Sequence, residues 1–170
     1  QWLNSDQPAT KWWTPQDKWD MMPDCAKTIP GFLAGFSEDF KNALTRTKVV
    51  TYGNTVTDDG SAVITYDKVF LPSLEEIYFN PQVKGEGAYW PYWKEATGAT
   101  APQALWQTYP LRITRDLAQP TVGRHVRLRS ASRGSACYAF FVSSSGYVGN
   151  WFAISAYRSA PACKITTLGQ

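Results

Sequence analysis

Apolar and polar residues follow helical spacing in two short segments of the first half of the chain. The run SEDFKNAL has a serine in the N-cap position, acidic residues in its first turn and apolar residues three or four positions apart. The run SLEEIYF follows Pro72 in the same way, with Ser73 as the cap and Glu75 and Glu76 in the first turn. The pattern therefore predicts two short helices.

Runs rich in β-branched and aromatic residues predict the strands. KVVTYGNTV and SAVITYDKVF are separated by Asp58, Asp59 and Gly60, a combination that favours a turn between two strands. From Arg124 onward, serine and glycine divide four short runs, RHVRLRS, ACYAFFVSS, YVGNWFAIS and SAPACKITT, which predicts an antiparallel meander. Residues 80–120 look irregular, and GAYWPYWKE is interpreted as a packed surface loop because Pro91 interrupts regular pairing.

Helices that come first and strands that come last indicate the α+β class. With 44% hydrophobic and 18% charged residues, we expect one folded domain over residues 1–170. No apolar run approaches the roughly 20 residues that a membrane span requires. The N-terminus also lacks the basic and then apolar segments of a signal peptide. We therefore expect no membrane span, and no signal peptide is visible in the chain.

Charge is divided unevenly along the chain. All 14 acidic residues lie at or before Asp116 with 11 of the 17 basic residues, which gives this part −3, whereas the last part carries +6. This asymmetry predicts a basic C-terminal face. Its charges are spaced among serine, alanine, phenylalanine and tyrosine, and no helix-turn-helix or zinc-finger spacing is present. We therefore expect no nucleic-acid partner.

Side chains suited to catalysis or metal binding are sparse. His125 is the only histidine, and no nucleophile motif accompanies it on its predicted strand. The paired carboxylates Asp58–Asp59 and Glu75–Glu76 suit a turn and a helix start. The three cysteines form no CxxC pair, so free thiols are expected, with a bridge between Cys137 and Cys163 as the alternative. We expect a protein that is not an enzyme, with no catalytic residues, no metal and no cofactor.

The segment from Arg124 to Cys163 has an unusual composition. It contains no Lys, Glu, Gln, Met, Asp or Thr and is dominated by Ser, Ala, Tyr, Phe, Arg and Gly. Aromatic residues offer large contact areas with few rotatable bonds, arginine offers a planar donor fork, and serine and glycine adapt to a partner. This composition favours a recognition surface. A sheet with one buried face, which also selects aromatic residues and disfavours charge, is the alternative interpretation.

The same segment, LRSASRGSACYAFFVSSSGYVGNWFAISAYRSAPAC, resembles the C-terminal part of a C-type lectin-like domain family found in bacterial and prophage proteins. Upstream, QWLNSD, WWTPQDKWD, GFLAGFSEDF, NTVTDDG and DKVFLPSLEEIY match the same family in the same order. The resemblance implies a C-type lectin-like fold, with two short helices, a twisted antiparallel sheet and long irregular loops. Members usually begin with a strand that pairs with the last one, and the resemblance implies that this chain lacks it.

Members of this family include the variable proteins of diversity-generating retroelements, in which selected codons change while a framework stays fixed. The resemblance implies a module of a phage tail or a bacterial surface that binds a protein or cell-surface ligand. A homo-oligomer and a part of a larger virion or surface protein both stay open. Framework alanines, Ala136 with Ala139 and Ala153 with Ala156, then bracket pairs of varied residues and let the backbone pack. The implied ligand-binding residues are Arg127, Ser132, Ser135, Cys137, Tyr138, Phe141, Ser143, Tyr147, Asn150, Trp151, Phe152, Ile154, Ser155, Tyr157 and Ser159.

Two other functions stay open from the sequence. The formylglycine-generating enzymes are related by fold and use a reactive cysteine pair, which would here be Cys137 and Cys163. A structural virion domain without a ligand is the third interpretation. The EPN, QPD and WND patterns of calcium-dependent sugar-binding lectins are absent, so neither calcium nor carbohydrate is implied.

Overall fold

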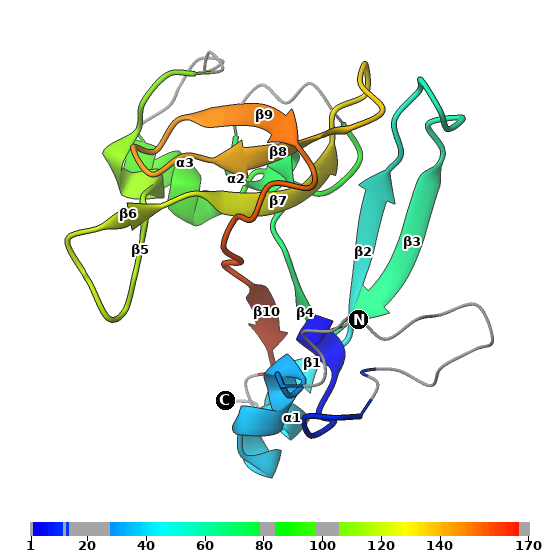
Figure 1. The fold of residues 1–170 in the computed structure, drawn as a ribbon, viewed down its shortest axis with the longest axis vertical. Helices are drawn as coiled ribbons and strands as arrows, with labels where there is room; N and C mark the ends of the chain where they lie inside the picture. Colours follow the sequence, from blue (N-terminus) through cyan, green and yellow to red (C-terminus); the bar gives the residue numbers. More distant parts are fainter. Residues whose placement is uncertain (1, 12, 14–27, 79–83, 98–105, 167–170) are drawn as a thin grey trace. The chain divides into compact units, whose positions relative to one another are not determined.

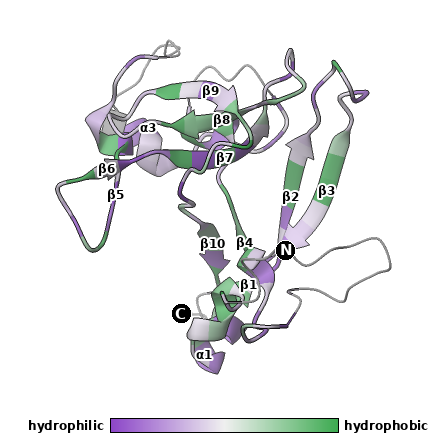
Figure 2. Ribbon diagram, in the orientation of Figure 1, coloured by the Kyte–Doolittle hydropathy of each residue, from purple (hydrophilic) through white to green (hydrophobic). Residues whose placement is uncertain are grey.

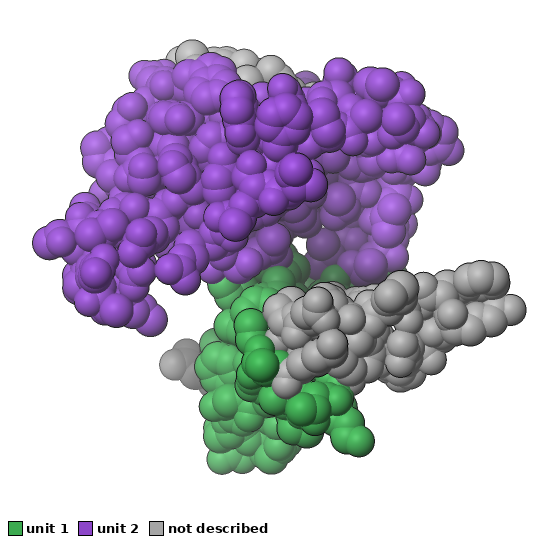
Figure 3. Space-filling view, in the orientation of Figure 1, with its two compact units in different colours: residues 1–48, 66–70, 161–170 green, residues 49–65, 71–160 purple. Residues whose placement is uncertain are grey.

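The structure is a computed structural model that describes residues 2–11, 13, 28–78, 84–97 and 106–166. The chain divides into two units (Figure 3): unit 1 comprises residues 1–48, 66–70 and 161–170, and unit 2 comprises residues 49–65 and 71–160. Both contain short helices and antiparallel strands (Figure 1), which confirms the α+β class. Within the described ranges, no helix is both long enough and apolar enough to cross a membrane.

Unit 1 is built on three short strands. Strand β10 (Ala162–Ile165) pairs antiparallel with β1 (Leu44–Thr45) on one side and β4 (Val69–Phe70) on the other. Its helical segments are η1 (Trp2–Asn4), η3 (Phe32–Gly35) and α1 (Glu38–Ala43). The buried core consists of Leu33, Leu44 and Val69, with Leu3, Phe32 and Phe40 packed against it.

The Asn4 side chain joins η1 to the start of β4. Its Oδ1 accepts hydrogen bonds from the backbone N–H groups of Lys68 at 2.8 Å and Val69 at 3.0 Å. Its Nδ2 donates to the Val69 carbonyl at 2.8 Å. A side-chain amide offers both a donor and an acceptor, so Asn4 satisfies backbone groups of β4 as a neighbouring strand would.

Both predicted helices are confirmed, and serine caps both. In α1, the Ser37 hydroxyl accepts from the Phe40 N–H at 3.3 Å. In α2 (Leu74–Ile77), the Ser73 hydroxyl accepts from the Glu76 N–H at 3.1 Å, while the Glu76 carboxylate accepts from the Ser73 N–H at 2.8 Å. This reciprocal pair is a capping box, which satisfies two backbone donors at the helix start.

The interpretation of GAYWPYWKE as a loop is wrong, because Pro91 begins the helix α3 (Pro91–Thr97). Proline suits the first helical position, where its missing N–H has no intrahelical acceptor and its fixed φ is already helical. Residues 80–120 are also more regular than expected elsewhere. They include η4 (Pro110–Arg112) and β5 (Thr114–Arg115), and β5 pairs with β6 (Gly123–Arg124).

The two strands predicted on either side of Asp58–Gly60 are confirmed as β2 (Thr47–Tyr52) and β3 (Ala62–Asp67), which pair with each other. The meander contains three strands instead of the four predicted: β7 (Val126–Ala131), β8 (Tyr138–Val142) and β9 (Val148–Phe152). The fourth predicted segment forms β10 in unit 1. The far edge of β9 is already occupied at Val148, whose carbonyl accepts from the Trp106 N–H at 3.0 Å.

The register of the meander sorts its side chains onto two faces. Val126 pairs with Val142, and Val142 pairs with Val148, so these three residues share one face. The next row consists of Arg127, Phe141 and Gly149, which pair with one another and lie on the opposite face. The first face carries the core of unit 2. In Figure 2, β8 is largely hydrophobic, as expected for a central strand with side chains covered on both faces. The core residues are Leu74, Ile77, Tyr78, Leu128, Phe140, Val142 and Val148, with Tyr52 and Trp93 packed against them.

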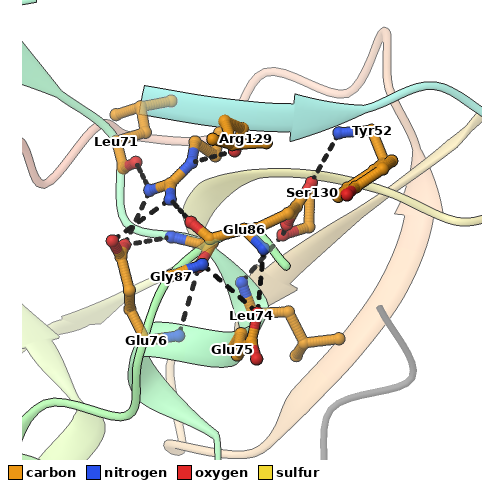
Figure 4. A network of polar contacts seen from close by, with 11 residues as sticks. Tyr52, Leu71, Leu74, Glu75, Glu76, Glu86, Gly87, Arg129 and Ser130 are labelled. Carbon is orange, nitrogen blue, oxygen red and sulfur yellow. Dashed lines mark hydrogen bonds and ion pairs between the residues drawn. The ribbon is translucent and has the colours of Figure 1, made fainter. Parts of the chain in front are cut away.

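A buried ion pair joins β7 to α2 (Figure 4). Arg129 Nη1 lies 2.6 Å from Glu76 Oε2 and Nη2 lies 3.1 Å from Glu76 Oε1, and both side chains are about nine-tenths buried. The same guanidinium donates to the carbonyls of Leu71 at 2.8 Å and Val50 at 3.3 Å, and to that of Glu86. Planar, two-pronged arginine–carboxylate pairs have fixed geometry, so the pair sets the position of β7 against α2.

Two other carboxylates extend this network. Glu86 is buried and accepts hydrogen bonds from the Ser130 hydroxyl and, at 2.9 Å, from the Tyr52 N–H. Glu75 Oε2 accepts from three consecutive N–H groups, those of Gly85 at 2.7 Å, Glu86 at 2.8 Å and Gly87 at 3.2 Å. Figure 4 shows these contacts converging from β2, α2, β7 and residues 85–87. The acidic pair at the helix start therefore holds distant segments as well as the helix.

We expect Glu76→Gln to lower the free energy of unfolding by about 3–5 kcal/mol, because it leaves the Arg129 charge buried without its carboxylate. Urea unfolding followed by tryptophan fluorescence measures this loss. The matched control is Glu38→Gln, which removes an exposed carboxylate, 78% accessible, from its pair with Lys41 and should cost less than about 1 kcal/mol. Equal losses in the two variants would contradict the role of the buried pair.

We expect Gly146→Ala to destabilise the protein by about 1–3 kcal/mol. Gly146 has φ +88°, and an added Cβ would lie 2.2 Å from the Tyr109 carbonyl oxygen. Gly134→Ala is the control, because nothing lies within 4 Å of the Cβ built there. Thermal unfolding of both variants checks this expectation, and a Gly146→Ala protein as stable as the control would show that the turn tolerates a side chain.

Candidate functional site

Three aromatic side chains meet at one end of β8 and β9, and we call them the aromatic trio. Tyr138 lies opposite Phe152 in the strand register, with ring centroids 4.9 Å apart and the rings edge to face. Trp151 stacks on Tyr138 at 6.1 Å and meets Phe152 at 5.4 Å. Trp151 is 48% exposed and Phe152 is 40% exposed. Adjacent apolar rings that stay in water are typical of a binding surface.

The turn after β9 extends this apolar surface. Ile154 is 94% exposed and lies between Phe152 and Ser155, whose N–H donates to the Phe152 carbonyl at 3.1 Å. The Ala153 N–H donates to the Cys137 carbonyl at 2.7 Å, which ties the turn to the start of β8. The paired ends of β8 and β9 and one turn therefore gather four predicted ligand-binding residues, Tyr138, Trp151, Phe152 and Ile154.

Arg127 holds the turn in place, although it was predicted to bind ligand. Its guanidinium donates to the carbonyls of Phe152 at 3.0 Å, Ser155 at 3.1 Å and Ala139 at 3.2 Å, with a longer bond to Ala153 at 3.4 Å. It also lies over the Tyr157 ring, 4.5 Å from the centroid. Burial lowers the pKa of Arg127, and the nearby Tyr157 partly offsets that effect. The donors of Arg127 are used inside the protein, so its role is to position the surface.

A second set of rings covers the sheet face opposite the core, and we call it the outer ring layer: Trp106, His125, Phe141, Tyr147 and Tyr157. Phe141 lies at its centre, 4.9 Å from Tyr157 and 6.0 Å from Tyr147 between centroids. His125 lies 5.6 Å from Phe141, and Trp106 lies 5.2 Å from Tyr147. Phe141 is only 4% exposed. Its prediction as an exposed binding residue is therefore corrected, because rings from distant parts of the sequence cover it.

Two predicted binding serines are also buried. Ser143 is fully buried, and its hydroxyl accepts from the N–H groups of Ser145 at 3.2 Å and Tyr147 at 3.1 Å, which closes the turn between β8 and β9. Ser132 is 8% exposed, and its hydroxyl accepts from the Asn150 amide at 3.3 Å. Both hydroxyls satisfy groups of the protein itself, so the prediction that they face a ligand is corrected.

The remaining predicted residues lie at different places. Cys137 is exposed beside the turn, and its sulfur lies 3.6 Å from the half-buried Ser135 hydroxyl. Ser159 is exposed and lines a separate pocket near β5 and β6. The half-buried residues of the predicted set are Arg127, Ser135, Tyr138, Tyr147, Asn150, Ser155 and Tyr157.

The expected packing role of the alanine pairs is wrong for most of their members. Ala136, Ala153 and Ala156 are exposed, and only Ala139 is half-buried within its strand. The backbone around them is held by hydrogen bonds, among them the one between Ala153 and Cys137. Hydrogen bonds, and not the close packing of small side chains, therefore fix the backbone around these alanines.

Of the six cations expected on a basic C-terminal face, four are engaged within the protein. Arg124 pairs with Asp116 at 2.9 Å, and Arg133 donates to the Gly60 carbonyl at 3.0 Å. Arg127 and Arg129 make the contacts described above. Arg158, with 68% of its side chain exposed, and Lys164 face solvent.

Among the described residues, His125, Cys137 and Cys163 do not gather into a cluster of metal ligands. His125 Nδ1 accepts from the Ser144 N–H at 3.3 Å, while its ring packs in the outer ring layer. Cys137 and Cys163 are free thiols in different units, so the alternative of a bridge between them is wrong, and Cys25 lies outside the described residues. In the part of the chain that the structure describes, no three His, Cys, Asp or Glu side chains gather as metal ligands.

Sequence reasoning missed Trp106, which is 54% exposed at the rim of the outer ring layer. Its six-membered ring lies where a Cβ on Gly149 would approach to 2.6 Å, so a side chain at position 149 would displace the tryptophan. The sequence feature that could have indicated this contact is Gly149 itself, because a glycine inside a strand often marks the close approach of another group.

We expect Arg127→Met to speed amide hydrogen exchange at residues 153–157 by about tenfold or more, since charged hydrogen bonds to the turn are lost. Mass spectrometry of the exchanged peptides measures this. Arg158→Met is the control, because it removes an exposed guanidinium from the same segment. Exchange that rises equally in both variants would show that Arg127 has no special hold on the turn.

Comparison with known protein families gives one match. A family model described as a domain of unknown function, DUF6273, matches residues 1–167. No curated protein and no solved structure matches the chain. The match covers both units and every residue of the aromatic trio. The chain therefore belongs to the DUF6273 family.

Proposed function

We propose that this chain is a binding module that captures a protein or cell-surface ligand with the aromatic trio and Ile154. The observation that carries the proposal is the placement of three strongly exposed apolar side chains, Trp151, Phe152 and Ile154, within one strand end and its turn. Desolvating such side chains against a partner contributes roughly 25 cal/mol per Å² of apolar surface. Aromatic residues at the centre of a patch are also the residues on which binding usually depends most.

Rigidity of the surface supports recognition. The turn is fixed by Arg127 and by the bond from Ala153 to Cys137, while the rings of the trio pack on each other. A surface already ordered before binding loses little conformational entropy when the ligand arrives. The trio therefore has the properties of a preorganised binding patch.

We further propose that the domain is C-type lectin-like and belongs to a retroelement-diversified variable protein of a phage or its bacterial host. The order of elements supports this: a capped helix, a hairpin, a second capped helix, a meander, and a last strand that returns to pair with β1. Four of the five exposed members of the predicted variable set, Cys137, Trp151, Phe152 and Ile154, also lie together at one end of the meander, whereas Ser159 lies apart. A protein whose binding residues vary while its framework stays constant needs the varied residues to lie apart from the core.

The binding proposal predicts that Trp151→Ser, Ile154→Ser and their combination lose capture of the ligand. Purified, labelled protein would be titrated onto cells of a panel of bacterial strains, and each variant should bind at least about tenfold more weakly to any strain that the wild type binds. Circular dichroism and thermal unfolding should remain close to wild type, because both side chains are exposed.

Tyr92→Ser is the matched control, since Tyr92 is an aromatic residue 62% exposed on α3, away from the trio in sequence. It should bind as the wild type does. Binding that is unchanged in the Trp151 and Ile154 variants would refute the proposed surface. The retroelement proposal predicts that the neighbouring DNA contains a reverse-transcriptase gene and a near-copy of the 3′ end of this gene. If both are absent, the structural virion domain is the better interpretation.

A further inference from the structure

A pocket beside β5 and β6 shares no lining residue with the aromatic trio. It has a volume of about 260 Å³, and the polar residues of its lining are Thr114, Arg115, Asp116, Arg124, Arg158 and Ser159. The lining contains three arginines and one aspartate, and the guanidinium groups of Arg124 and Arg158 lie near the Asp116 carboxylate. The pocket therefore keeps two positive charges that its own residues do not neutralise.

Asp116 is committed to the hairpin that frames the pocket. Its Oδ1 accepts from the Ala118 N–H at 2.9 Å, and its Oδ2 lies 3.1 Å from Arg124 Nε and 2.9 Å from Arg124 Nη2. The Ala118 N–H and then Arg124 hold the pKa of Asp116 below its ordinary value, so this carboxylate stays ionised at neutral pH. Arg115 and Arg124 also donate to the Thr121 carbonyl and the Gln119 side chain, both at 3.3 Å, so these two arginines are partly engaged within the hairpin.

Arg158 is the cation best placed to donate to another acceptor. Its Nη2 lies 3.8 Å from Asp116 Oδ2, beyond hydrogen-bond distance, and 68% of its side chain is exposed. Its backbone is fixed, because its N–H donates to the His125 carbonyl and its carbonyl accepts from the Arg127 N–H, both at 2.9 Å. A fixed backbone thus carries an exposed guanidinium to the pocket rim.

We propose that this pocket binds an oxyanion, carried by either a phosphate or a carboxylate group, with Arg158 as the main donor and Arg124 as the second cation. Guanidinium groups bind such groups with two parallel hydrogen bonds. The hydroxyls of Thr114 and Ser159 add further donors along the lining. The inference does not depend on the ligand of the aromatic trio.

Inorganic phosphate and succinate are the two probes. Each would be titrated into the full chain at constant ionic strength, with the amide signals of Gly123 and Ser159 followed by nuclear magnetic resonance. We expect saturable binding that weakens about tenfold in Arg158→Ala and less in Arg158→Lys, which keeps the charge but not the fork. Asp116→Asn should strengthen binding, because it removes the competing negative charge.

Lys94→Ala is the matched control, since it removes one exposed positive charge outside the pocket and should leave both affinities unchanged. Tighter binding of phosphate assigns the pocket to phosphate-bearing ligands, and tighter binding of succinate assigns it to carboxylates. The proposal is overturned if neither anion saturates the wild-type protein, or if Arg158→Ala and Lys94→Ala weaken binding equally. Exposed Arg158 variants are expected to fold, which the dispersion of the same spectra checks.

Discussion

The buried contact between Arg129 and Glu76 is the constraint on which unit 2 depends. Removing two charges from water is costly, and the cost is offset only where each donor and acceptor finds a partner. Here the guanidinium reaches one carboxylate and three carbonyls, on segments that are far apart in sequence. A shift of β7 by one residue would turn Arg129 to the other face and leave Glu76 buried alone. The pair thus selects one register for the strand that starts the meander.

Local signals in the sequence predicted local structure well. Ser37 and Ser73 cap helices because a serine hydroxyl reaches an N–H only three residues away, so a short window contains all the information. The prediction of a loop at Pro91 was wrong because proline is unfavourable inside a strand but suits the first position of a helix. The choice between the two depends on Trp93, which packs against a core formed by other segments.

The candidate site could be predicted only in part, because exposure is a property of the assembled sheet. Trp151 and Phe141 both lie on strands of the meander and both read as varied aromatic residues, yet one is exposed and the other is covered by Tyr157 and His125. Burial of Phe141 depends on a return of the chain after β9 that no local pattern encodes. The charge asymmetry likewise gave no sign that Arg127 is engaged inside the protein, because its acceptors are carbonyl groups, which carry no signature in composition.

Arg127 holds residues 152–155 through main-chain carbonyl oxygens, and every amino acid carries that oxygen. These hydrogen bonds therefore do not depend on which side chains residues 152–155 carry. Substitutions of those side chains therefore leave the hydrogen bonds from Arg127 to the segment in place. A single arginine thus separates the shape of the segment after β9 from the identity of the side chains that it carries.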